Sequence, residues 1–172
     1  MAKKDSKKNK EDKKYKRPSW EEYFMEVVHA VAKRATCSRG RNGAVIVKDR
    51  QMLATGYVGS AVGQPHCDDV GHLMETTKHV DGVERQHCVR TIHAEQNAIV
   101  QAAKHGIAIK GSTIYTKLEP CPACARMIVN AGIKKVVAEK LYHAAQESRK
   151  IFELAGTEIV QLSDEIEKYD NQ

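Results

Sequence analysis

The chain has 172 residues, 41% hydrophobic and 29% charged, a composition typical of one globular domain. Its net charge of +6 is concentrated in residues 1–17, where nine lysines and arginines outnumber three acidic residues, while the rest is balanced. No apolar run is long enough for a membrane span or a secretory signal. An odd number of cysteines, five, favours a reducing cytoplasm over a disulfide framework.

Residues 1–18 contain few apolar side chains and are expected to form a disordered basic tail. Such a tail can bind a polyanion such as nucleic acid in a salt-dependent way, although a solubilising role is the favoured interpretation. Ser19 and Glu22 then form a capping-box pattern. This pattern predicts a helix that continues to about Ala35.

Two β-rich runs at 43–48 and 51–58 are separated by Asp49 and Arg50, which predicts an antiparallel hairpin. The following segment, 59–91, shows little periodicity and many Gly, His, Cys and Asp residues. We expect it to be a long loop, and loops of this length are uncommon unless they are functional.

The second half of the chain alternates between helical and strand patterns. Helices are expected at 92–105, 120–131 and 143–154, and strands at 112–116, 133–139 and 157–162. This alternation predicts a partly parallel sheet covered by helices. The folded domain is therefore expected to span 19–162, and residues 163–172 to form a short polar helical tail.

In this half of the chain, three side chains are of the types that bind a zinc ion, and a fourth, a carboxylate, can transfer protons beside them. His93 precedes Glu95 by two residues, and Cys121 and Cys124 follow Pro120 at a spacing of three. A helix that begins near Pro120 would place both thiols on one face, and its N-terminus would stabilise thiolates. Two thiolates and one imidazole leave the fourth zinc position open, as catalysis requires.

Water bound at an open zinc position has a pKa near 7, which supplies hydroxide at neutral pH. Glu95, a non-ligand in this interpretation, can take the proton of the water and deliver it to a ring nitrogen and a leaving amine. Cys-x-x-Cys alone is more typical of structural zinc or of a redox pair. Combined with His-x-Glu it is the signature of the zinc-dependent base deaminases, so the pattern predicts hydrolytic deamination.

Further stretches support a specific family: 43–47, 55–57, 93–99, 120–124 and 130–134. From about Trp20 to Leu162 the chain resembles the deoxycytidylate (dCMP) deaminases and the related late competence proteins. The resemblance implies a cytidine deaminase-like α/β fold, with three layers α/β/α and a five-stranded mixed sheet. It also implies conversion of dCMP to dUMP and ammonia, which supplies dUMP for thymidylate synthesis. A homo-oligomer, hexamer or dimer, regulated by dCTP and dTTP would be expected.

A second group of cysteines and histidines flanks the long segment 59–91. The segment has too few apolar residues to form a hydrophobic core of its own. The family resemblance implies a second, structural zinc site of the kind that would stabilise it. We expect a structural zinc held by Cys37, Cys67 and Cys88 together with His87, or alternatively His66. The other interpretation is free buried thiols and surface imidazoles.

A nucleotide substrate also requires cations and a cover for its ring. Arg39 matches an arginine of the family before the first strand, and Arg90 lies three residues ahead of His93; guanidinium binds phosphate in bidentate fashion. Tyr142 matches a family tyrosine that could cover the ring or reach the phosphate. Asn42 and Ala94 complete the predicted substrate contacts.

The chain also departs from the family at three positions. Relatives usually read Gly-Tyr-Asn-Gly where this chain has Val58, and usually have valine where it has Asn42. Lys117 stands where relatives often have a small or hydrophobic residue. An amide lost at one position and present at another suggests compensation between them.

Three functions are compatible with these residues. The favoured one is a dCMP deaminase; the same zinc motif also fits a tRNA adenosine deaminase or a deaminase of another cytosine nucleotide. A non-catalytic zinc-ordered interaction module is the third, and the intact Glu95 argues against it.

Overall fold

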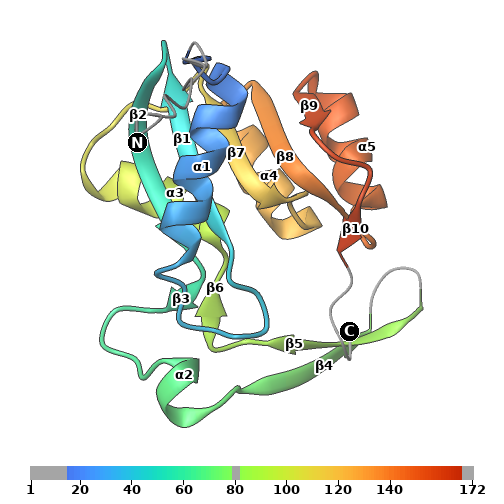
Figure 1. Ribbon diagram of the computed structural model, residues 1–172. Coiled ribbons are helices and arrows are strands. Elements are labelled where there is room, and N and C mark those ends of the chain that lie inside the picture. Colours follow the sequence, from blue (N-terminus) through green and yellow to red (C-terminus); the bar gives the residue numbers. More distant parts are fainter. Residues whose placement is uncertain (1–14, 79–81, 168–172) are drawn as a thin grey trace, which may run out of the picture.

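A computed structural model describes residues 15–78 and 82–167, and a mixed β-sheet forms its centre (Figure 1). The strand order is β2-β1-β7-β8-β9, and β10 also pairs with β8. β1 is antiparallel to both of its neighbours, whereas β7, β8 and β9 are parallel. The strands are β1 (Gly43–Lys48), β2 (Gln51–Tyr57), β7 (Thr113–Leu118), β8 (Lys135–Tyr142) and β9 (Glu158–Gln161).

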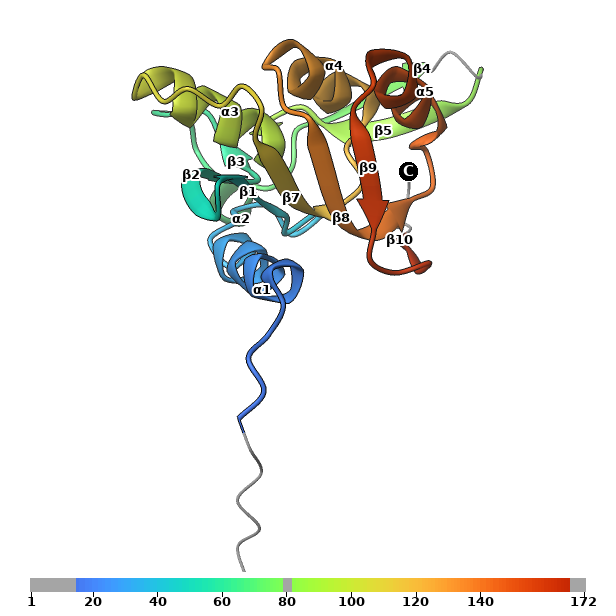
Figure 2. The ribbon, with the colours of Figure 1, turned by 90° about the horizontal axis from the view of Figure 1, so that it is seen from above.

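Helices cover both faces of this sheet, which confirms the expected three-layer α/β/α arrangement (Figure 2). One face carries α1 (Trp20–Ala32), whose Phe24 and Val28 pack with Val45, Tyr115 and Val137 of the strands. The other face carries α3 (Ala94–Lys104), α4 (Pro122–Asn130) and α5 (Gln146–Ala155). Within the described residues, no helix has the length and hydropathy that a membrane crossing requires.

The helices approach the sheet closely at two glycines. A Cβ atom at Gly43 would lie 2.6 Å from the carbonyl oxygen of Val28 in α1. A Cβ atom at Gly56 would lie 2.2 Å from the carbonyl oxygen of Ala94 in α3. Any side chain at either position would force the helix away from the sheet. Gly56 therefore fixes where the first turn of α3 lies.

The capping box that begins α1 is confirmed. The Glu22 carboxylate accepts from the Ser19 backbone at 2.7 Å, and the Ser19 hydroxyl accepts from the Glu22 backbone at 3.2 Å. The helix ends at Ala32, three residues before the expected end.

Segment 59–91 differs from the expected unstructured loop. It contains a short helix, α2 (Cys67–Val70), and a hairpin of β4 (Met74–Lys78) and β5 (Glu84–Cys88). Short strands β3 (Gly59–Ser60) and β6 (Thr91–Ile92) pair with each other. All five residues of β4 are exposed, so the hairpin lacks the alternation of buried and exposed positions that reveals a strand. Figure 1 shows the hairpin extending beyond one end of the main sheet.

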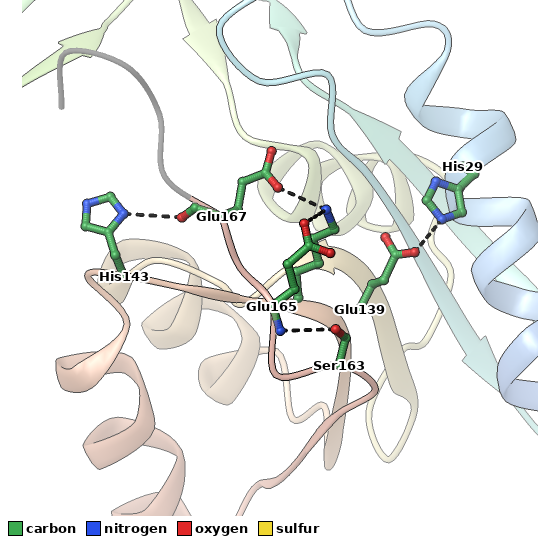
Figure 3. Close-up of polar contacts among 7 residues, drawn as sticks. His29, Glu139, His143, Ser163, Glu165 and Glu167 are labelled. Carbon is green, nitrogen blue, oxygen red and sulfur yellow. Dashed lines mark hydrogen bonds and ion pairs between the residues drawn. The ribbon is translucent and has the colours of Figure 1, made fainter.

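The C-terminal segment is the second difference, because the polar helix expected at 163–172 is wrong for the described part. Instead, β10 (Ile166–Glu167) pairs in parallel with the end of β8. The ammonium of Lys140 contacts carboxylate oxygens of Glu165 at 2.7 Å and Glu167 at 3.2 Å, and His143 contacts the Glu167 carbonyl (Figure 3). The polar residues of this segment thus bind the strand rather than form a helix. Residues 168–172, and most of the expected basic tail, lie outside the described residues.

Candidate active site

His93 is the N-cap residue of α3, and contacts with the sheet fix its place. The backbone of His93 donates to the Gln96 side chain at 3.2 Å, and the Asn97 side chain donates to the Tyr57 carbonyl at 2.7 Å. Together with the close approach at Gly56, these contacts hold the first turn of α3 against the end of β2. Glu95 lies in this turn and is buried.

Cys121 is the N-cap residue of α4, and Pro122 occupies the first turn. The helix therefore begins two residues later than expected, and Cys121 has extended backbone angles of φ −68° and ψ 166°. Cys124 follows in the first turn and is fully buried. The two sulfur atoms therefore approach each other from the N-cap and from the first turn of α4. They do not lie on one helical face, contrary to the prediction from sequence.

The ring of His93 and the two sulfurs meet, and we call His93, Cys121 and Cys124 the three-donor cluster. Nδ1 of His93 lies 3.5 Å from Sγ of Cys121 and 3.4 Å from Sγ of Cys124. Ligands of a tetrahedral zinc stand about 2.0–2.3 Å from the metal, which places neighbouring donors roughly 3.5 Å apart. The donor set fits zinc with one coordination position left open.

The surroundings of the three-donor cluster favour a thiolate. A hydrogen bond from the Cys124 thiol, and then the His93 ring, lower the pKa of Cys121 to about 4 in spite of burial. The Cys121 thiolate in turn raises the pKa of His93 to about 9. Burial raises the pKa of Glu95, whose carboxyl group lies close to His93 and Cys124. A thiolate is the form of cysteine that binds zinc, and a carboxyl group with a raised pKa is suited to proton transfer.

Sequence reasoning assigned no role to Glu119, two residues before Cys121. Its side chain has no exposed surface, and Arg149 of α5 binds it through Nε at 2.8 Å and a terminal nitrogen at 2.6 Å. The Gln161 amide and the Tyr142 backbone also donate to it, at 2.8 and 2.9 Å. Burial alone would raise the pKa of Glu119, but these donors, Arg149 first, hold it below its usual value. The interaction of Glu119 with Arg149 could not be predicted from a sequence motif, because the two residues are 30 positions apart.

A cavity of about 270 Å³ lies where β1 begins and β7 ends. Its lining is rich in cations and hydrogen-bonding groups: Ser38, Arg39, Gly40, Arg41, Asn42, Lys117 and Glu167. Lys117 is four residues before Cys121, and Asn42 directly precedes β1. A larger cavity, of about 370 Å³, lies between Trp20 and Gly111 and contains none of the predicted site residues.

The predicted substrate residues are only partly brought together. Arg39 and Asn42 line the smaller cavity, but Arg90 and Ala94 do not. Tyr142 stands at the end of β8; burial and then the nearby Cys121 raise its pKa, whereas Arg85 opposes the increase. Arg85 of the β4–β5 hairpin is thus a further cation near the site that the sequence did not reveal. Ala94 is buried, and the buried Nε of Arg90 has no hydrogen-bond partner in the described part of the chain.

Asn42 and Val58, the two exchanged positions, are neighbours in the structure. The backbone N–H of Val58 donates to the carbonyl of Asn42 at 3.0 Å, directly beyond the pair of Gly43 with Tyr57. Val58 itself is buried. Asn42, one residue before β1, is thus the backbone neighbour of Val58, one residue after β2.

Three further cysteines gather with one histidine, and we call Cys37, Cys67, His72 and Cys88 the four-donor cluster. All four donor atoms lie within 4.8 Å of one another. Sγ of Cys67 is 3.5 Å from Sγ of Cys88, and Sγ of Cys37 is 3.6 Å from Nδ1 of His72. Burial and then the contact with Cys88 raise the pKa of Cys67 to about 12, so a cation would be needed to ionise it. Four donors fit a closed structural zinc site.

The imidazole of the four-donor cluster is that of His72, in place of the expected His87 or His66. His87 precedes Cys88 in β5, and adjacent strand residues point to opposite faces. The ring of His66 instead contacts the Thr36 hydroxyl at 3.1 Å. The second ring nitrogen of His72 lies 3.4 Å from the Ser38 hydroxyl, an arrangement that orients a metal-binding histidine.

Comparison with known proteins agrees with this geometry. The family model of the cytidine and deoxycytidylate deaminase zinc-binding region matches residues 18–140. ComE operon protein 2 of Bacillus subtilis is 43% identical over 146 residues, which cover 85% of this chain and 72% of that protein. The deoxycytidylate deaminase of Mycobacterium phage D29 is 37% identical over 129 residues, covering 72% of this chain and 97% of that enzyme.

A solved structure shows the same fold. The dCMP deaminase from the cyanophage S-TIM5, in complex with dCMP and dUMP, superposes with a TM-score of 0.67 at 28% identity. The match covers 86% of this chain and 99% of that one. Sequence, fold and zinc-binding geometry agree: the chain belongs to the cytidine and deoxycytidylate deaminase family.

Proposed function

We propose that this protein is a zinc-dependent deaminase that converts dCMP and water to dUMP and ammonia. The observation that carries the proposal is a cluster of three metal donors with the buried Glu95 beside it. A cavity whose lining includes Arg39, Arg41 and Lys117 supports it, since Lys117 is four residues before Cys121. The named deoxycytidylate deaminases among its relatives support the choice of substrate.

Zinc held by His93, Cys121 and Cys124 would supply a Lewis acid that lowers the pKa of water. Glu95 accepts a proton from the attacking water and donates it to N3 of cytosine. Glu95 then transfers the second proton of the water to the exocyclic amine as the bond between C4 and nitrogen breaks. The oxygen of water stays on C4, and ammonia leaves.

The cation-lined cavity would bind the 5′-phosphate. Arg39 offers a guanidinium, whose planar geometry suits phosphate oxygens. Lys117 has no ion-pair partner within residues 15–78 and 82–167, so its charge is available to a ligand. Asn42 would supply the amide that Val58 cannot, since the two residues lie side by side. Four extended residues span at most about 14 Å, so Lys117 is within a nucleotide's reach of Cys121.

The four-donor cluster would hold a structural zinc. Cys37 directly precedes the cavity-lining residues 38–42, while Cys67, His72 and Cys88 come from α2 and the hairpin. A metal there would fix the substrate-binding residues to a segment that buries little apolar surface.

The proposed reaction also suggests a role for the protein in nucleotide metabolism. Deamination of dCMP in the cytoplasm would supply dUMP for thymidylate synthesis, and a homo-oligomer would respond to dCTP and dTTP. Sedimentation with and without each effector, together with activity at low dCMP concentration, tests assembly and regulation.

The decisive experiment measures ammonia release from dCMP, CMP, deoxycytidine and dCTP by the wild-type protein and by Lys117→Met. We expect dCMP to be preferred, and Lys117→Met to lower kcat/KM for dCMP about tenfold without affecting deoxycytidine. Lys104→Met, at the far end of α3, is the matched control and should change neither. Inosine formation in a tRNA hairpin with no turnover of any cytosine nucleotide would overturn the proposal.

A further inference from the structure

We infer that Glu119 is a positioning residue that sets the place of the Cys121 thiolate, and through it the activity of the catalytic metal. The inference rests on the proposed zinc site, because Glu119 acts through Cys121. It assigns a function to a buried charged group that the deamination chemistry itself does not use.

The turn between β7 and α4 is held by a backbone hydrogen bond, by the burial of Pro120 and by the Glu119 side chain. Leu118 ends the strand and Pro122 begins the helix, so residues 119–121 connect the two, with Cys121 as the extended N-cap. The Glu119 backbone N–H donates to the Lys140 carbonyl at 3.1 Å, which continues the pairing of β7 with β8. Pro120 is fully buried and has no N–H to donate.

The Glu119 side chain ties this turn to three other elements. It accepts two hydrogen bonds from Arg149 of α5, one from Gln161 at the end of β9, and one from the backbone of Tyr142 at the end of β8. A carboxylate has about four acceptor positions, and four donors reach this one. Such a group has one geometry that satisfies all its partners, so the turn and the Cys121 thiolate that follows are held in one place.

This rigidity matters because Cys121 comes from a helix cap, whereas Cys124 lies in the helix and is fully buried. Of the two thiolates, Cys121 therefore depends more on the turn that precedes it. Groups that orient metal ligands typically change metal affinity or activity by about 10- to 100-fold when they are replaced.

The chain offers a matched control. Arg126 and Glu147 form a second ion pair between α4 and α5, but both side chains are substantially exposed and neither touches the 119–121 turn. Removing this pair weakens the connection between α4 and α5 but leaves the 119–121 turn bound. It therefore tests whether the helix connection alone determines the position of Cys121.

The test compares Glu119→Gln, the double variant Glu119→Gln with Arg149→Met, and Arg126→Met as the control. The double variant also removes the Arg149 cation that the single variant leaves without its carboxylate partner, which separates loss of folding from loss of positioning. Three quantities are measured: kcat and KM for dCMP, zinc affinity by chelator competition, and the thiolate-to-metal absorption bands of the cobalt-substituted protein. The absorption bands need no substrate. Taken as the difference from Cys124→Ala, in which only the four-donor cluster would bind cobalt, they report on Cys121 even if dCMP is not the substrate.

We expect both Glu119 variants to lower kcat or zinc affinity by about 10- to 100-fold, with KM little changed and the cobalt bands shifted. Arg126→Met should match the wild type in all three. If the double variant regains wild-type kcat and cobalt bands, Glu119 only balances the charge of Arg149, and the inference is overturned. Unaltered bands and affinity in the single variant would overturn it as well.

Discussion

The two cysteine and histidine clusters of this molecule have similar donors but different surroundings. The three-donor cluster lies where two core helices begin, and the sheet fixes both helix starts through buried contacts such as that of Gly56 with Ala94. The four-donor cluster joins segments that bury little apolar surface, and the strand β4 between its members is exposed throughout. Helix starts packed on the sheet position the donors of the first cluster. In the second, packing buries Cys37 and Cys67 in the core, but His72 is exposed and Cys88 is half-buried, so a metal would have to fix those two.

This contrast explains how many donors each cluster has. Where hydrophobic packing already orders the ligands, a metal can be held by three of them and keep one position for a reacting molecule. Where the ligands replace a hydrophobic core, all four positions are used for stability. The two clusters also differ in their carboxylates: Glu95 is buried beside the first, whereas among residues 15–78 and 82–167 no carboxylate belongs to the second.

Among changes that leave both donor clusters intact, the largest expected effect comes from Glu95→Gln. This change keeps the shape of the side chain and removes its capacity to carry a proton, so kcat for dCMP should fall by about 10²- to 10⁴-fold. Zinc content should stay at two ions per chain, measured by atomic emission on the purified protein. Loss of one zinc together with activity would mean that Glu95 is a ligand and that the three-donor cluster is not open.

Cys67→Ala should affect folding more than chemistry. With three donors left, the four-donor cluster should lose its zinc, and amide hydrogen exchange should become faster across residues 59–92. KM for dCMP should rise roughly tenfold or more, because Cys37 no longer anchors residues 38–42. Exchange in α3 and α4 should be unchanged.

Cys124→Ala is the counterpart of this experiment. It should remove the catalytic zinc and activity, and leave exchange in the hairpin as in the wild type. If both variants loosen both regions, the clusters form one folding unit and the contrast between them fails.

A smaller effect is expected when a histidine near the four-donor cluster is replaced, and His87 serves as the control for His72. His72→Ala should weaken zinc binding at the four-donor cluster by at least about tenfold in chelator competition, whereas His87→Ala should leave it unchanged. His87 pairs with Glu75 across the hairpin, while Cys88 faces the cluster. The opposite result would restore His87 as the ligand predicted from sequence.

Prediction from sequence succeeded where the signal was local. Spacings of two and three residues pointed to His93, Cys121 and Cys124, whose donor atoms meet in the structure, and a glycine or capping residue marked most helix ends. The parallel part of the sheet, β7, β8 and β9, followed from the alternation of strands and helices in the second half of the chain, and the family resemblance supplied the five-stranded mixed sheet. These features depend on residues near one another in sequence.

Prediction failed where the partners are distant or the pattern is hidden. The hairpin that excludes His87 from the four-donor cluster has no buried face, so no alternation revealed it. The Glu119 network joins residues 23, 30 and 42 positions apart, which no local pattern connects. In residues 163–167 the expected helix was wrong, because Glu165 and Glu167 bind Lys140 of the neighbouring strand β8.

The smallest effect concerns the ion pair that joins the four-donor cluster to the cavity. Arg41 lines the cavity and binds Asp68, which follows Cys67 in α2, at 3.0 and 3.1 Å. Both side chains are partly exposed, at 45% and 38%, so water screens the pair and its contribution to stability is small. Asp68→Asn breaks the pair but keeps the cation, and Arg41→Met removes the cation too.

If the pair serves to anchor residues 38–42, both variants should raise KM for dCMP by the same small factor, up to about fivefold, with kcat and zinc content unchanged. If Arg41 instead binds the phosphate, only Arg41→Met should raise KM, and the effect should be absent for deoxycytidine. The first result would show that the four-donor cluster acts on the substrate site through this contact. The second would confine that cluster to holding the hairpin.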